Sequence, residues 1–166
     1  MFEKSIELLN KAVADELLAV HQYMFFHFHL DDQGFDLLST LFKRTAIEEM
    51  GHVEALAERI IFLKGEVKME TAGPIKPLTV VSEMLATARY MEEESARDYN
   101  IWANESSANN DAITKKVFEN LVADEERHFA NYDLELENVK KFGDRYLALQ
   151  SIERSKSAAS GVASAE

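Results

Sequence analysis

The chain has 166 residues, 46% hydrophobic and 29% charged, which indicates one soluble globular domain large enough to bury a core. The absence of cysteine excludes disulfides, thiolate zinc sites and iron–sulfur clusters, and leaves histidine and carboxylate as the strong metal ligands. A net charge of −12 argues against nucleic acid as a partner, and the sequence has neither a signal-peptide pattern nor an apolar run of membrane-spanning length. We therefore expect a cytoplasmic protein that binds no membrane.

Apolar residues recur at steps of three and four along four long segments, which is the pattern of amphipathic helices. Glycines at 34, 65 and 143 mark helix ends between these segments. A shorter fifth helix is expected near the C-terminus. One all-α domain should therefore cover residues 1–156, with a disordered Ser- and Ala-rich tail at 157–166. The helices are predicted at about 3–32, 36–64, 79–106, 110–141 and 144–155.

In chain order, each of the four long helices has acidic or imidazole side chains inside the apolar stripe that should face the core. These side chains are Glu16 in the first helix, Glu49 and His52 in the second, Glu92 in the third, and Glu125 and His128 in the fourth. Two Glu-x-x-His motifs result, and each follows a partner glutamate by 33 residues. One such motif is a weak signal, but two copies at the same offset rarely arise by chance. This repeat is typical of a carboxylate-bridged di-iron centre in a four-helix bundle.

Burial of four glutamates in a core requires compensating positive charge, because an unpaired buried carboxylate costs several kcal/mol. No lysine or arginine lies on the four stripes, so two divalent cations would supply that charge. Carboxylate and imidazole ligands suit iron or manganese. Buried polar pairs without a metal are the alternative. The two-fold pattern predicts Glu16 and His52 on one ion, Glu92 and His128 on the other, and Glu49 and Glu125 as bridges.

The link between the second and third helices, residues 65–78, contains both prolines. Fully extended, these residues reach roughly 45 Å, whereas a helix of 28 residues is about 42 Å long. The link can therefore cross the whole bundle. This length predicts a ferritin-like four-helix bundle with one long crossover, for which a simple up-down bundle is the alternative.

Residues next to the predicted ligands could also act at the same site. Glu93 and Glu94 follow Glu92 directly but are rotated by about 100° and 200° from it, so they should face solvent. Tyr23 and Tyr99 each lie seven residues after a predicted ligand, where a phenol could hydrogen-bond a site carboxylate or donate an electron. Tyr23 is the stronger candidate, and packing alone is the alternative for both.

At this point the sequence resembles the bacterioferritins over nearly its whole length. The short C-terminal helix matches this family as well. The resemblance implies a hollow cage of twenty-four subunits built of dimers, which oxidises Fe(II) with O₂ or H₂O₂ at an intrasubunit centre of two iron ions and stores the product as a mineral. The partner that donates electrons for iron release is not identified by the sequence. The matching residues are Glu16, Tyr23, 49–52, 58–60, Glu92, Glu125 and His128.

Met50, inside the second ligand motif, matches the methionine that binds haem b in bacterioferritins. That haem lies at a two-fold dimer interface and takes one methionine from each subunit. Exposed apolar faces indicate interfaces, so the resemblance predicts haem at Met50, with a haem-free dimer contact as the alternative. His21 and Lys43 place polar groups on this face, and no role follows for His27 or His29. The second apolar stripe consists of Ala46, Met50, Val53 and Ala57.

The sequence also departs from the family. Arg44 and Glu48 stand where some bacterioferritins have a His and an Asp that handle an extra iron at the inner surface, which puts that site in doubt. Two other functions stay open. One is peroxide detoxification at the same centre, as in the twelve-subunit mini-ferritins, whose sites however lie between subunits. The other is a helical bundle that binds haem or a protein without catalysis.

Overall fold

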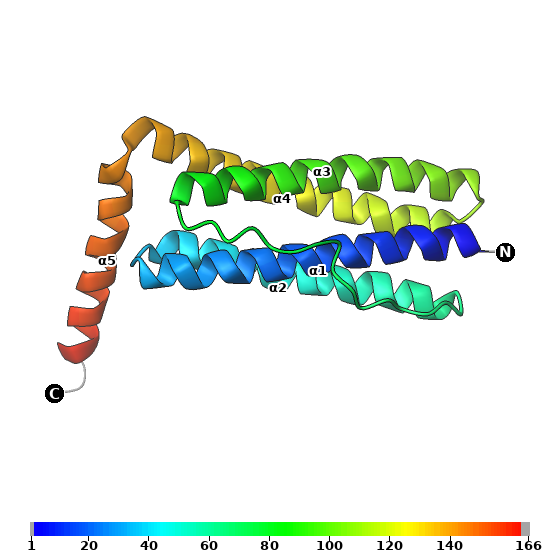
Figure 1. Cartoon of the computed structure of the whole chain (residues 1–166), viewed down its shortest axis with the longest axis horizontal. Coiled ribbons are helices and arrows are strands. Elements are labelled where there is room, and N and C mark those ends of the chain that lie inside the picture. The colour runs from blue at the N-terminus through cyan, green and yellow to red at the C-terminus, as the bar shows by residue number, and fades with distance from the viewer. Residues whose placement is uncertain (1, 164–166) are drawn as a thin grey trace.

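Five α-helices and no strand make up the part of the chain that the computed structural model describes, residues 2–163 (Figure 1). Within these residues, none of the helices combines the length and the apolar character needed to cross a bilayer. Each of the four long helices begins and ends within two residues of its predicted range, which is the usual uncertainty of helix ends. The helices are α1 (Glu3–Asp32), α2 (Asp36–Phe62), α3 (Val81–Ala108), α4 (Ala112–Phe142) and α5 (Asp144–Ala163).

The four long helices form two hairpins, α1 with α2 and α3 with α4, joined by one long connection (Figure 1). The connection leaves the end of α2, runs back along α1 and reaches α3 at the opposite end of the bundle. This arrangement is the predicted ferritin-like bundle, and it excludes the up-down alternative. Gly65 lies where the connection starts, and a Cβ there would come within 2.8 Å of the Ile6 side chain. The turn therefore needs glycine for its close approach to α1.

Two amide side chains of α1 hold the crossover connection. The Gln22 side chain is buried, donates from Nε2 to the Lys76 carbonyl at 2.9 Å and accepts from the Lys76 N–H at 2.7 Å. Asn10 makes the same paired contact twelve residues earlier, donating to the Glu66 carbonyl at 3.0 Å and accepting from the Lys68 N–H at 2.8 Å. These bonds satisfy backbone groups that an extended segment would otherwise leave unpaired.

Replacing Gln22 by alanine should lower the free energy of unfolding by about 1–3 kcal/mol, because the Lys76 N–H loses its partner and the Lys76 carbonyl keeps only its bond from the Leu78 N–H. Denaturant titration gives this value, and hydrogen exchange at the Lys76 amide should accelerate. Gln33→Ala is the matched control, since Gln33 makes one exposed bond to the Thr79 carbonyl and its loss should cost less than about 0.5 kcal/mol. Equal losses in the two variants would contradict the assignment.

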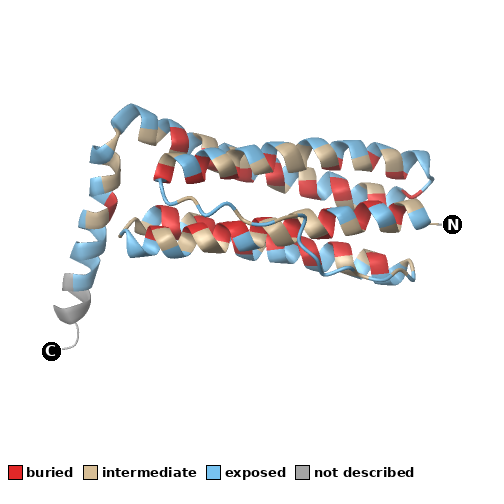
Figure 2. Ribbon diagram, viewed as in Figure 1, coloured by how far each residue is buried: buried red, intermediate tan, exposed pale blue. Residues whose placement is uncertain are grey.

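Buried residues line the inner faces of the four long helices (Figure 2). They form two apolar clusters on either side of a layer of buried polar groups. One cluster is built around Phe26 and Phe42, and the other around Leu9 and Phe118, all fully buried. Burial of each such side chain contributes about 1.5–3 kcal/mol relative to exposure. The apolar clusters therefore stabilise the bundle, and the polar layer between them is where the predicted ligands meet.

The helix α5 crosses the end of the bundle rather than continuing along it (Figure 1). Its Gln150 side chain is buried and accepts a hydrogen bond from the Leu38 N–H at 3.4 Å. The prediction for this region was partly wrong, because α5 extends to Ala163, where 144–155 was expected to be helical and 157–166 disordered. The alanines in this stretch have the highest helix propensity, which accounts for the continuation. Residues 164–166 of the expected tail lie outside the described residues.

Candidate metal centre

The six predicted ligands come together in the polar layer, and each residue is between 1% and 7% exposed. Their ligand atoms form two groups, in each of which all atoms lie within 4.8 Å of one another. Glu49 and Glu125 belong to both groups. These two are the glutamates that the sequence predicted as bridges. One group contains Glu16, Glu49, His52 and Glu125, and the other Glu49, Glu92, Glu125 and His128.

Two tyrosines hold the glutamates that belong to one group only. Tyr99 donates a hydrogen bond to Glu16 Oε1 at 2.6 Å, and Tyr23 donates to Glu92 Oε1. Both rings are fully buried, and burial raises the pKa of each phenol well above its ordinary value, so both stay protonated as donors. The sequence ranked Tyr23 above Tyr99, whereas the structure gives the two equivalent positions. Their equal spacing from Glu16 and Glu92 was the signal for this equivalence.

Electrostatics in the centre are dominated by buried carboxylates. Burial, followed by the charge of Glu49, raises the pKa of Glu16 to about 8. Burial also raises the pKa of Glu92 to about 8 and that of Glu49 above its ordinary value. Burial acts to lower the pKa of His52, but the carboxylates close to its ring, Glu125 first, outweigh burial and raise that pKa. The centre of the protein alone therefore retains protons at neutral pH.

Several buried atoms of the centre have no hydrogen-bond partner. They are both carboxylate oxygens of Glu49, Oε1 of Glu125 and Nδ1 of His52. Nδ1 of His52 lies 2.7 Å from Glu49 Oε2, within ion-pair distance but without hydrogen-bond geometry. Buried polar atoms in native proteins are nearly always satisfied, and a bound ion is one of the recognised reasons for exceptions. Buried carboxylate oxygens and an imidazole nitrogen without hydrogen-bond partners are suitable ligands for divalent iron or manganese.

The far nitrogen of each histidine faces a carboxylate outside the centre. His128 Nε2 lies 2.8 Å from Glu48 Oε2, and His52 Nε2 lies 3.3 Å from Asp124 Oδ2. A carboxylate that accepts the Nε2 proton leaves Nδ1 free to bind a metal. Glu48 was predicted only as a departure at the inner surface, and Asp124 had no predicted role. The available signal was an acidic residue directly before the glutamate of both Glu-x-x-His motifs.

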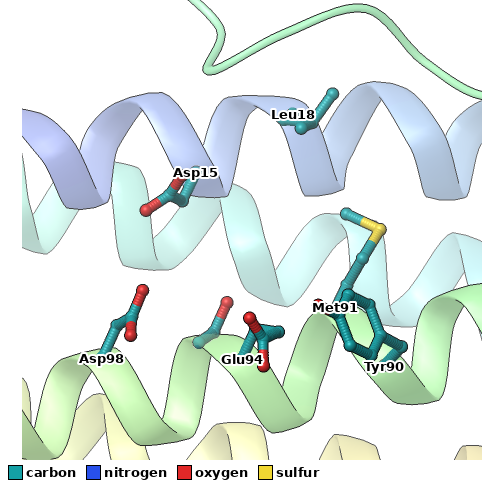
Figure 3. A pocket seen from close by; sticks show the side chains of 7 residues that line it. Asp15, Leu18, Tyr90, Met91, Glu94 and Asp98 are labelled. Carbon is teal, nitrogen blue, oxygen red and sulfur yellow. The ribbon is translucent and has the colours of Figure 1, made fainter.

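A separate acidic cavity of about 250 Å³ lies between α1 and α3, lined in part by Asp15, Glu94 and Asp98 (Figure 3). Figure 3 shows Asp15 on α1 turned toward Asp98 on α3. Burial, followed by the charge of Asp98, raises the pKa of Asp15 to about 6. None of these residues belongs to the two ligand groups. Glu94 lines this cavity and is half-buried, which corrects its predicted place on the solvent face, whereas Glu93 is exposed as predicted.

Replacing Asp15 by asparagine should stabilise the protein at neutral pH and leave it unchanged in acid. The folded chain raises the pKa of Asp15 from 3.8 to about 6, so ionisation of Asp15 removes stability as pH rises through that range. Partial solvent screening limits the gain at about pH 7.5 to about 1 kcal/mol, and at about pH 4 it should vanish. Thermal melting at both pH values measures it, with Asp32→Asn, an exposed site on α1, as control. A gain independent of pH would contradict this account.

The remaining candidate residues lie outside the centre. Met50 is 58% exposed on the outer surface of α2. Nδ1 of His27 lies 2.9 Å from the Ser39 hydroxyl, the His29 ring lies 4.4 Å from that of Phe25, and His21 is exposed. The three histidines therefore take no part in the two ligand groups.

Fold and donor set together define a ferritin-like protein, and the family model for the ferritin-like domain matches residues 6–142. The chain is 35% identical to the bacterioferritin of Desulfovibrio desulfuricans over 87% of this chain and 81% of that one. It is 33% identical to the bacterioferritin of Brucella melitensis, over 85% and 88%. An X-ray structure of the D. desulfuricans bacterioferritin, determined to show its di-iron site in different catalytic states, superposes with a TM-score of 0.88 at 34% identity and covers 89% of this chain and 86% of that chain. The chain belongs to the bacterioferritins.

Proposed function

We propose that this protein oxidises Fe(II) to Fe(III) at the buried centre and stores the product as a ferric mineral inside a cage of its own subunits. The observation that carries the proposal is the pair of ligand groups that share Glu49 and Glu125. Glu16 and His52 would hold one iron ion, Glu92 and His128 the other, and the shared glutamates would bridge them. The D. desulfuricans relative with a di-iron site supports this assignment.

A pair of ferrous ions at the centre supplies two electrons to one molecule of O₂ or H₂O₂. The protein positions the ligand carboxylates and takes up or releases protons. Glu16 and Glu92, whose pKa values are raised to about 8, release their protons when cations replace them. Tyr99 and Tyr23 fix the orientation of these carboxylates, and the apolar clusters on both sides exclude water. With O₂ as the oxidant, two Fe(II), one O₂ and two protons give two Fe(III) and one H₂O₂.

The storage function requires assembly, and we propose a homo-oligomeric cage of twenty-four chains built of dimers. Exposed apolar side chains on α1 and α2, including Phe28 (61% exposed), Ile47 (57%) and Met50 (58%), support contacts between copies on this face. The exposed thioether of Met50 would suit haem iron as a ligand. We propose haem b between two such faces. The visible absorption spectrum of the purified protein should show a haem band that Met50→Leu removes, and the absence of a band would leave Met50 a dimer contact.

The test of function is aerobic addition of Fe(II), in excess over two ions per chain, to the purified metal-free protein. Ferric absorbance should rise, and the iron should remain with a particle of cage mass on native mass measurement. Comparing the consumption of O₂ with that of H₂O₂ during Fe(II) oxidation identifies the oxidant, and a strong preference for H₂O₂ would favour peroxide detoxification. Failure to retain iron or manganese would overturn the proposal in favour of a non-catalytic bundle.

A further inference from the structure

We propose that Arg127 is a positioning residue that holds both ligand histidines in place through two carboxylates. Its guanidinium lies outside the centre and touches none of the six ligands. Its Nη2 atom lies 2.8 Å from Glu48 Oε2 and 2.8 Å from Asp124 Oδ1. A single nitrogen therefore ties a carboxylate of α2 to a carboxylate of α4. The inference rests on the proposed function, because it assumes that His52 and His128 bind metal.

The two carboxylates that Arg127 joins are those that face the histidines, and each serves the histidine of the other helix. Glu48 on α2 lies 2.8 Å from Nε2 of His128 on α4. Asp124 on α4 lies 3.3 Å from Nε2 of His52 on α2. Two histidine–carboxylate contacts therefore join α2 to α4, and Arg127 contacts the carboxylate of each. Both imidazole rings depend on one guanidinium for the direction in which Nδ1 points.

Charge explains why a cation is needed at this place. Glu48 and Asp124 add two carboxylates beside a centre that already contains four. A guanidinium stays protonated at any working pH, so Arg127 keeps both acids ionised as acceptors and offsets their repulsion. Arg44 also approaches Glu48, but its Nε is 3.8 Å away and its side chain is 61% exposed. Arg127, at 2.8 Å from both acids, is the closer partner.

The solvent exposure of the Arg127 ion pairs indicates that they contribute to the position of the histidines more than to folding stability. The side chains of Arg127 and Asp124 are 48% and 42% exposed. Ion pairs at this exposure add little to folding stability. Partners of metal-bound histidines, in contrast, typically change metal affinity by about 10- to 100-fold. Loss of Arg127 should therefore weaken metal binding and leave the melting temperature of the metal-free protein nearly unchanged.

The experiment compares Co(II) binding to metal-free wild type, Arg127→Met and Arg127→Lys, by titration calorimetry and by the visible spectrum of bound Co(II). Arg127→Met keeps the aliphatic stem and removes the charge, and its affinity should fall at least about 10-fold. Arg127→Lys supplies one bridging nitrogen, so it should stay within about 3-fold of wild type, because one nitrogen makes both contacts. The matched control is Arg97→Met, since Arg97 on α3 binds Glu94 three residues earlier at 2.6 Å and contacts no histidine.

A second experiment tests whether Arg127 acts through the two carboxylates. In the Glu48→Ala, Asp124→Ala background, the further change Arg127→Met should have no effect on Co(II) affinity, because nothing remains for Arg127 to hold. Wild-type affinity in Arg127→Met, or an equal loss in that background, would overturn the role of Arg127 while leaving the centre intact. No Co(II) binding by the wild type would overturn the proposed function and this inference together.

Discussion

Replacing both Glu49 and His128 by alanine should abolish rapid iron oxidation. Glu49 lies in both ligand groups, so its loss removes a ligand atom from each proposed ion, and His128 is the one imidazole of its group. Removal of residues outside the ligand set typically costs about 10- to 100-fold, so loss of two direct ligands should lower the rate by more than about 100-fold. Stopped-flow measurement of ferric absorbance after mixing with Fe(II) in air gives the rate.

The neighbouring acid provides the control for this double variant. Glu93 follows Glu92 directly on α3 but is exposed, and Glu93→Ala should oxidise iron at the wild-type rate. Far-ultraviolet circular dichroism and native mass should be unchanged in all variants, which separates lost ligands from lost fold. An unchanged oxidation rate in the double variant would rule out the assigned centre.

Metal binding should raise the melting temperature of the metal-free protein by about 10–20 °C. Each ion at one hundred times its dissociation constant adds about 2.7 kcal/mol, and for a chain of this size each kcal/mol is worth about 2–4 °C. Relief of repulsion among the four buried carboxylates is the physical source of the gain. Thermal melting with and without Zn(II), which has no redox chemistry, measures the shift, and a chelator should reverse it.

A neighbouring pair of glutamates tests whether this shift arises at the centre. Glu92→Gln removes a buried ligand carboxylate and should reduce the shift by about half, because one of two ions loses a ligand. Glu93→Gln makes the same chemical change one residue away on the exposed face and should keep the full shift. Equal shifts in the two variants would place the stabilising ions elsewhere on this acidic chain.

The parts of the structure that depend on helical periodicity could be predicted from the sequence. Glu16, Glu49 and Glu125 continue apolar stripes, so their inward direction follows from position along a helix. The crossover followed from the length of its link and from its prolines. The limits of prediction appear where a contact joins two helices through partly exposed side chains. Glu48 and Asp124 look like solvated charges in the sequence, because nothing local shows that they face a histidine of another helix.

The outer contacts and the C-terminal helix show two further limits. Arg127 occupies a variable position inside the Glu-x-x-His motif at 125–128, and its reach to Glu48 depends on the spacing between α2 and α4. Tyr99 was undervalued because a buried tyrosine in a stripe is usually packing, although its spacing matched that of Tyr23. The end of α5 depends on weak propensities of alanine and serine, which pattern alone does not resolve.

The polar layer between the two apolar clusters makes the stability of the metal-free protein uneven along the bundle. Each end is an apolar core, whereas the layer between them buries four carboxylates whose charge is offset in the metal-free protein by protons on carboxyl and imidazole groups. Local unfolding should therefore begin in the polar layer, while both apolar clusters stay packed. Bound cations would link the helices across this layer. Resistance to local unfolding should therefore become even along the subunit only when it carries metal.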